Sequence, residues 1–184
     1  MKHYICVLVV LLTGGCAFFH NTPAKIMPEA SQAVQGRILD KDRFLIGGNL
    51  LLVPFSAGPG VAETDKTERM ALMMVKGLTE TVRSSALRWH VLNASDAGDA
   101  DIILHGYITA VRSPSKWNLL GGDRIYLAVE GKVTDARTGD FLAEFRHSVE
   151  GRPDEGFLSL AERIGKDLAA FILLEKDRPE RTDQ

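Results

Sequence analysis

The fold is decided by the stretch 100–150, which begins ADIILHGYITAVR (residues 100–112) and continues into two runs of alternating apolar and polar residues. One side of the middle run carries Ile125, Leu127, Val129 and Val133. The other side carries Arg124, Tyr126, Glu130, Lys132 and Thr134. Successive side chains of a strand point to opposite faces, so this run predicts a strand with one dry face and one solvated face. Sheets solvated on one face are typically antiparallel, and the stretch therefore predicts an antiparallel meander.

The turn between the last two runs is Asp135-Ala-Arg-Thr-Gly-Asp140. Its Gly139 supplies the positive φ that short hairpin loops require. In the run that follows, the residues expected on the dry face are Phe141, Ala143, Phe145 and Val149. A dry face needs a covering layer, and helices are the usual one.

Two segments have the apolar periodicity of such helices. The first begins at Thr64 or Asp65 and ends near Ser84, with a stripe of Met70, Met73, Met74, Leu78, Thr81 and Val82. A methionine-rich stripe also occurs in promiscuous binding grooves, but we interpret this one as packed core. The second helix starts after Asp154 and Glu155, which suit the positive end of the helix dipole, and its apolar stripe runs over residues 157–172. We expect both helices on the dry face.

Two shorter segments flank the first helix. Residues 49–55 are almost continuously apolar, which predicts a central strand buried on both faces and ended by Pro54. Residues 88–93 predict a second strand, so that the helix becomes the crossover of a βαβ unit. Residues 37–46 favour an additional edge strand. The expected fold class is an α/β (α+β) two-layer sandwich, with a mixed sheet of about five strands, a βαβ unit, an antiparallel meander and two helices on one face.

Composition limits the class of protein. The chain has 184 residues, 45% of them hydrophobic, which is typical of a globular domain. Its formal net charge of −2 argues against a nucleic-acid partner, because phosphate binding needs a clustered basic face. The two cysteines are Cys6 and Cys16. Cys6 lies in a segment expected to be cleaved, so the mature chain would have no internal disulfide.

The N-terminus, MKHYICVLVVLLTGGC, has a basic start and an apolar core of about ten residues, which is typical of a secretory signal peptide. Gly14, Gly15 and Cys16 resemble the lipobox of bacterial lipoproteins, although Thr13 stands where leucine is usual. The resemblance implies that Cys16 carries palmitate and other acyl chains and anchors the protein to a membrane. Ala17 follows Cys16 in place of Asp, which resembles the pattern of outer-membrane sorting. The alternative is an ordinary cleaved signal with a chance cysteine.

These patterns divide the chain into four segments. Residues 1–15 are the expected lipoprotein signal peptide, and residues 16–47 a tether that leads into the domain. Residues 48–175 form the α/β domain, and residues 176–184 a charged tail. The expected location is the periplasm, with an anchor in the outer membrane of the cell envelope.

Three short patterns in the domain are Pro54-Phe55, Ala100-Asp101 followed by Gly106, and Asp135 with Thr138-Gly139. With them, residues 48–175 resemble the periplasmic α/β lipoprotein superfamily. That superfamily includes the curli-secretion lipoprotein, the activator lipoproteins of penicillin-binding proteins and the N-terminal domain of the Tol–Pal propeller protein. The resemblance implies a protein that binds partners or oligomerises in the envelope and is not an enzyme.

The chemistry-bearing residues give no pattern of an active site. His90, His105 and His147 each lie in a predicted strand, and the sequence contains no His-x-x-x-His or Cys-x-x-Cys spacing. Asp99 and Asp101 are explained by a turn entering a strand. We therefore expect no catalytic residues, no metal and no cofactor.

The loop 113–123 carries Trp117, Leu119 and Leu120, where hairpin loops are normally polar. These side chains either fold back over the end of the core or contact a partner. We predict a non-catalytic, lipid-anchored accessory protein that presents the solvated face and this loop to a protein partner in the periplasm. The alternative is a subunit of an oligomeric secretion or transport assembly, which leaves a homo-oligomer open.

Overall fold

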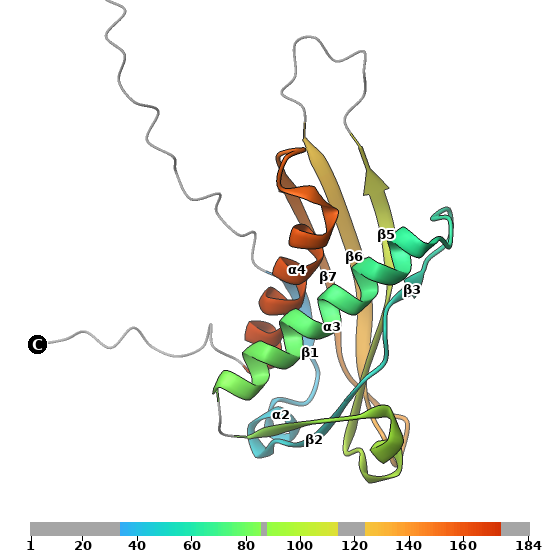
Figure 1. Ribbon diagram of the computed structural model, residues 1–184. Coiled ribbons are helices and arrows are strands. Elements are labelled where there is room, and N and C mark those ends of the chain that lie inside the picture. Colours follow the sequence, from blue (N-terminus) through green and yellow to red (C-terminus); the bar gives the residue numbers. More distant parts are fainter. Residues whose placement is uncertain (1–33, 86–87, 114–123, 174–184) are drawn as a thin grey trace, which may run out of the picture. The chain divides into compact units, whose positions relative to one another are not determined.

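The computed structural model describes residues 34–85, 88–113 and 124–173, which lie in one compact unit (Figure 1). These residues form a seven-stranded mixed sheet with the order β1-β7-β6-β5-β2-β4, and β3 pairs with β5 beside this path. The sheet has more strands than the approximately five that the sequence predicts, because an edge strand and one further short strand add to the βαβ unit and the meander. A mixed α/β architecture with an open sheet and helices is confirmed.

The predicted meander is present. It consists of β5 (Ile102–Arg112), β6 (Ile125–Asp135) and β7 (Phe141–Gly151), and both pairings are antiparallel. The turn between β6 and β7 holds Gly139 at φ 77°, as its position in the hairpin requires. Asp135 shapes the same turn, because its carboxylate accepts hydrogen bonds from the backbone N–H groups of Arg137 and Thr138.

The predicted βαβ unit is also present. β2 (Gly48–Leu52) runs parallel to β4 (Trp89–Leu92), and α3 (Asp65–Ser85) connects them. β2 is also parallel to β5, so it joins the βαβ unit to the meander. The second predicted helix is α4 (Gly156–Ile172), which follows β7.

Four further elements complete the described part of the chain. β1 (Gln35–Ile38) is the edge strand beside β7, and α2 (Lys41–Ile46) follows it within the stretch that the sequence predicts as strand. β3 (Ser56–Ala57) extends the sheet along β5, and η1 (Ala94–Asp99) is a short 3-10 helix before β5. The predicted edge strand therefore exists but ends earlier than expected, because Asp40 caps a helix there.

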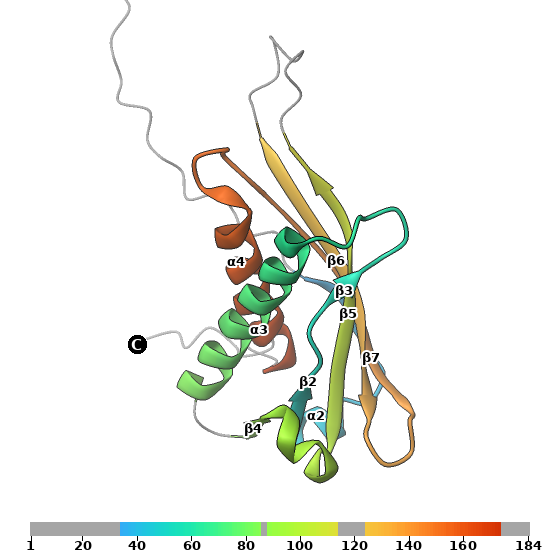
Figure 2. The same ribbon diagram turned by 45° about the vertical axis from the view of Figure 1, so that its right-hand side comes forward.

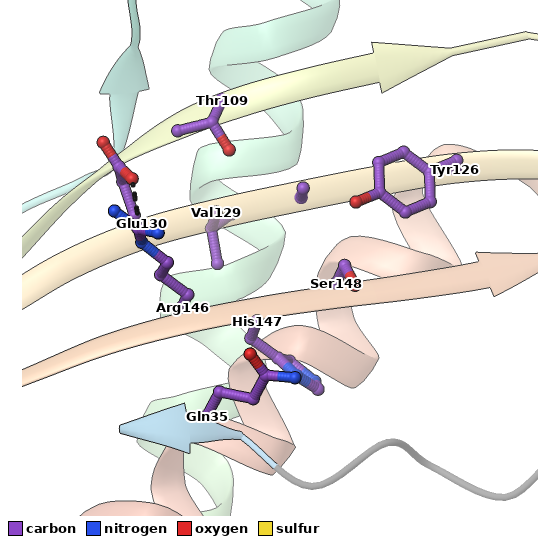
Figure 3. A pocket seen from close by; sticks show the side chains of 9 residues that line it. Gln35, Thr109, Tyr126, Val129, Glu130, Arg146, His147 and Ser148 are labelled. Carbon is purple, nitrogen blue, oxygen red and sulfur yellow. Dashed lines mark ion pairs between the residues drawn. The ribbon is translucent and has the colours of Figure 1, made fainter. Parts of the chain in front are cut away.

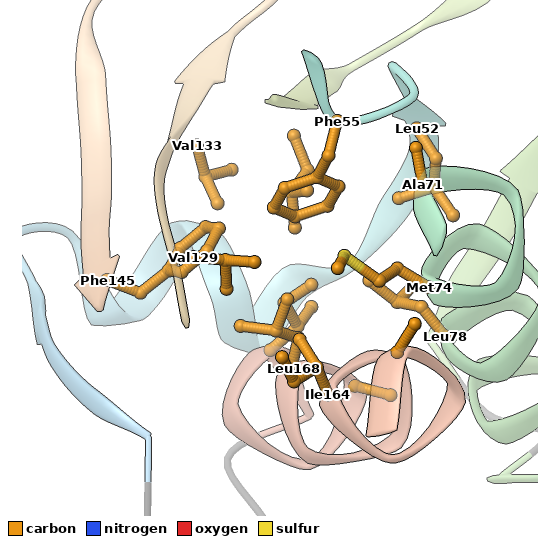
Figure 4. Packing of buried hydrophobic residues seen from close by; sticks show 14 of the residues in the cluster. Leu52, Phe55, Ala71, Met74, Leu78, Val129, Val133, Phe145, Ile164 and Leu168 are labelled. Carbon is orange, nitrogen blue, oxygen red and sulfur yellow. The ribbon is translucent and has the colours of Figure 1, made fainter. Parts of the chain in front are cut away.

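Both long helices cover the same face of the sheet, as Figure 2 shows. Apolar side chains of the strands, such as Val129, Val133 and Phe145, meet Met74 of α3 and Ile164 of α4 (Figure 4). Two methionines of the α3 stripe, Met70 and Met74, are core residues with 0% exposure, and Met73 is half-buried against the core. Burial of each such side chain stabilises the fold by roughly 1.5–3 kcal/mol.

The helices approach each other through two glycines. A Cβ atom on Gly165 of α4 would overlap the carbonyl oxygen of Met74, and one on Gly77 of α3 would overlap that of Glu162. At these two positions the backbones of the helices are thus in direct contact. A larger residue at either position would push the helices apart and open the core beneath them.

The expected position of Phe141 is wrong. Phe141 is 56% exposed and lies on the solvated face, while Leu142 is 5% exposed. The pairing of β6 with β7 shifts register between Val133 and Thr134, which pair with Ala143 and Phe141. The extra residue is Leu142, and this bulge turns the side chain of Phe141 to the other face.

The expected burial of the β2 strand on both faces is also wrong. Leu50 is 0% exposed and Leu52 is 9% exposed, but the intervening Leu51 is only half-buried and Val53 is 39% exposed. The reason is that α3 and α4 lie on one face, and no described helix covers the other. Leu51 and Val53 face that uncovered side.

The assignment of faces predicts opposite effects for two substitutions in β6. Leu127 is 0% exposed, and Leu127→Asp places an unpaired charge in the core. Burying this charge costs several kcal/mol of folding free energy, which should prevent folding. Lys132→Ala on the solvated face should change the free energy of unfolding by about 0.5 kcal/mol or less. Thermal unfolding followed by circular dichroism measures both. Equal midpoints for the two variants would contradict the assignment.

Candidate binding surface on the solvated face of the sheet

The solvated face of the sheet, opposite α3 and α4, carries most of the polar side chains of the meander strands. Strand pairing places its side chains in rows that cross the meander and β1. One row consists of Tyr107, Glu130, Arg146 and Gln35. The next row consists of His105, Lys132, Glu144 and Arg37. At the centre of this face, on β6 and β7, carboxylates and cations therefore alternate in both directions.

Two hollows lie over these rows. The smaller, about 410 Å³, has Tyr126, Glu130, Arg146 and Ser148 among its lining residues (Figure 3). The larger, about 690 Å³, has His105, Lys132 and Glu144 among its lining residues. Arg146 Nε and Glu130 Oε2 form an ion pair of 3.5 Å, which Figure 3 shows between the two strands. The hollows offer charges of both signs to an incoming surface.

His105 adds a neutral polar group to this face. Partial burial lowers its pKa, and the positive charge of Lys132 opposite it lowers the pKa further. The imidazole therefore stays neutral at pH 7 and can both donate and accept a hydrogen bond. Its neighbour on the face, Tyr107, is 45% exposed and adds an aromatic ring with a hydroxyl group.

An apolar strip adjoins the charged rows. Leu51 pairs with Ile103, and both are half-buried on the solvated face. Val53 and Phe141 are more exposed, and the ring of Phe141 lies 4.4 Å from Lys132 Nζ. Large exposed apolar side chains gathered on one surface are typical of protein–protein contact sites. The sequence did not predict this strip.

A second polar cluster, around Asp101, joins elements of the chain to one another. The Asp101 carboxylate accepts hydrogen bonds from the backbone N–H of Asn49, at 2.9 Å, and from the Arg137 guanidinium, at 3.1 Å. Arg43 of α2 lies 3.5 Å from Asp101 and 3.7 Å from Asp135. This cluster ties α2, β2 and the β6–β7 turn to the start of β5, and all of its contacts are structural.

The same contacts shift the acidity of Asp101. The Asn49 N–H is the main cause of its lowered pKa, and Arg137 and Arg43 add to the effect against an opposing contribution from burial. Backbone N–H donors from Thr138 and Arg137 likewise lower the pKa of Asp135. Both carboxylates are thus held in the ionised form, which suits a structural bridge.

The three strand histidines do not converge. His90 is exposed on β4, and His105 lies on the solvated face. His147 is buried on the dry face, where its Nε2 atom lies 2.8 Å from an Asp167 oxygen and links β7 to α4. Within residues 34–85, 88–113 and 124–173, no group of His, Cys, Asp or Glu residues is placed to hold a metal ion.

The predicted lipidation residue, Cys16, and the predicted partner-contact residues, Trp117, Leu119 and Leu120, lie outside the described residues. Their roles stay predictions. Among the described helices, none is long and apolar enough to cross a membrane.

Comparisons with known proteins identify a shared fold. No protein-family model matches the chain, and no curated protein matches it. The chain is similar to the solved structure of the PelC dodecamer from Paraburkholderia phytofirmans, with a TM-score of 0.50 and 14% identity over 77% of this chain and 98% of that one. A lipoprotein from Neisseria meningitidis gives a TM-score of 0.39 at 15% identity, over 68% of this chain and 97% of that one. The likeness to PelC shows the fold alone.

The Asp101 cluster predicts a loss of stability in acid. A carboxylate whose pKa is lower in the folded state than in the unfolded state stabilises the fold above its unfolded pKa, and this contribution disappears as pH falls through the folded value. We expect Asp101→Asn to lower the free energy of unfolding at pH 7 by about 1 kcal/mol. The loss is this small because water partly screens the charge of Asp101. The difference from the unmodified protein should shrink below about pH 4.

Urea unfolding at pH 7 and at pH 3 measures this difference. Asp99→Asn is the matched control, because Asp99 is exposed and lies two residues away at the end of η1. A penalty for Asp101→Asn that is equally large at both pH values would show that the charge of Asp101 is not the cause.

Proposed function

We propose that this protein is a lipid-anchored accessory protein of the cell envelope, whose α/β domain binds a protein partner in the periplasm without catalysing a reaction. The observation that carries the proposal is the solvated face. It combines exposed Tyr107 and Phe141 with paired charges of both signs, and no described helix covers it. Aromatic residues within a polar surround are typical of protein interfaces.

The proposed site of lipid attachment is Cys16. The apolar segment before it and the small residues Gly14 and Gly15 resemble a lipobox, and Ala17 resembles the signal for outer-membrane sorting. Several acyl chains on one cysteine give stable membrane attachment, whereas a single chain gives only marginal attachment. Residues 17–33 would then separate the membrane from the first described strand. A tether of this kind leaves the domain free to meet a partner in the periplasm.

A second candidate function is a subunit of an oligomeric secretion or transport assembly. The likeness to PelC, which was solved as a dodecamer, favours it. The resemblance to the curli-secretion lipoprotein also favours a secretion assembly, whereas the resemblance to the other superfamily members favours binding of a partner. Sedimentation of the protein in detergent at micromolar concentration separates the two, because only the assembly subunit has to associate with itself.

The lipid anchor is tested by Cys16→Ser. Removal of the acylated sulfur removes the membrane affinity, so we expect the variant in the soluble fraction after cell lysis. The unmodified protein should sediment with outer membranes and stay there after a high-salt wash. A Cys16→Ser protein that still sediments after this wash would mean that something other than Cys16 holds it.

The partner contact is tested by combining Trp117→Ala with Leu119→Ser in the full chain. Truncation of a buried interface aromatic costs about 2 kcal/mol or more of binding, which weakens capture of an envelope partner about thirtyfold. The melting temperature should stay close to that of the unmodified protein. Leu72→Ser is the control, because Leu72 is 61% exposed on α3, away from the solvated face. A variant that melts much earlier would instead assign the loop to the core.

A further inference from the structure

Four charged residues at the centre of the solvated face form a square, which we call the charge square. Glu130 and Lys132 lie on β6, and Arg146 and Glu144 lie opposite them on β7. Residues two apart in a strand point to the same face, so all four side chains share this surface. Each corner of the square has the opposite sign to both of its neighbours.

The charge square is accessible to another molecule. The side chains of Arg146 and Glu130 are 80% and 45% exposed, although they form an ion pair with each other. Glu144 is exposed, and Lys132 is half-buried beside the ring of Phe141. Pairs this exposed hold their partners weakly, because water screens the charges and the long side chains stay mobile. The four groups can therefore form new pairs when a second surface arrives.

A square of alternating charges is complementary to itself. When a two-fold axis lies in the plane between two such squares, along either midline, every carboxylate of one copy faces a cation of the other. A uniformly acidic or basic partner would meet two attractive corners and two repulsive ones. The pattern thus favours a second copy of this chain over a partner of one charge sign. Interfaces with two-fold symmetry pair the same patch of both subunits in this way.

The surroundings of the charge square suit burial against a second sheet. Val53, Tyr107 and Phe141 are 39%, 45% and 56% exposed. Tyr107 pairs with Glu130 of the charge square, whereas Val53 and Phe141 belong to the apolar strip with the half-buried Leu51 and Ile103. Sheets that pack face to face lie about 10 Å apart, close enough for such side chains to interdigitate. Apolar contact would supply affinity, and the charge square would fix the orientation of the two copies.

We propose that the solvated face docks on the same face of a second copy in a two-fold symmetric dimer, with Glu130 and Glu144 of each copy opposite Lys132 and Arg146 of the other. The proposal deepens the second candidate function, because it names the surface through which this chain associates with itself. It rests on self-association and assigns one interface of the resulting assembly.

The test uses two full-length variants with reversed charges, each purified in detergent with two different affinity tags. Glu130→Lys with Glu144→Lys makes the square wholly basic, and Lys132→Glu with Arg146→Glu makes it wholly acidic. Two basic squares repel each other, as do two acidic ones, but a basic square complements an acidic one. We expect co-capture between tags to fall at least tenfold for either variant alone and to return when the two variants are mixed.

The matched control is Glu68→Lys with Glu80→Lys on the exposed side of α3, which changes the net charge as much as the basic variant does. It should co-capture itself like the unmodified protein. Circular dichroism checks that each variant is folded. If a double variant does not fold, the single substitution Glu144→Lys or Arg146→Glu is used in its place. The loss of co-capture should be smaller at 1 M salt, where the Debye length is about 3 Å.

The outcomes separate this proposal from the candidate function on which it rests. If the unmodified protein does not co-capture itself at micromolar concentration, both the dimer and the self-assembly function are wrong. If both reversed variants still co-capture themselves like the unmodified protein, self-assembly stands and the proposed surface is wrong. Failure of the mixed variants to associate, when each variant alone is monomeric, would also overturn the charge pairing.

Discussion

The close contact of α3 with α4 is the constraint on which the rest of the structure depends. Gly77 and Gly165 let the two backbones touch, at Glu162 and Met74 respectively. The helices lie as one layer over the dry face, and Met74 and Ile164 both reach the strands beneath. A core this well packed tolerates added volume poorly, because each extra methyl group displaces several neighbours.

Placing both helices in one layer has a consequence for the opposite face. One face of each strand then contacts the core and the other contacts solvent. The meander strands fit both environments because apolar and polar residues alternate along them. β2 does not alternate, so Leu51 and Val53 are left on a face that no described helix covers. The arrangement that completes the core thus also creates the apolar strip, which belongs to the surface that we propose for binding.

Charge has two separate roles in this domain. Around Asp101 the ionised groups act within the chain: Asn49, Arg43 and Arg137 come from three distant segments and hold α2 and the β6–β7 turn against β5. The charge square lies on two neighbouring strands and leaves its groups accessible. The Asp101 cluster holds elements of the domain together, whereas the groups of the charge square are accessible to another molecule.

The sequence by itself determined the elements whose signal is local. Alternation predicted the meander and the dry face of β6, periodicity predicted α3 and α4, and the hairpin at Gly139 followed from its turn residues. Only the tertiary structure decided that one side of β2 stays uncovered, that a bulge at Leu142 turns Phe141 outward, and that Glu130, Lys132, Glu144 and Arg146 form a square. The physical reason is that periodicity reports where a side chain points along its own element. Register, bulges and the choice of covered face depend on contacts between residues far apart in the chain, which no local pattern contains.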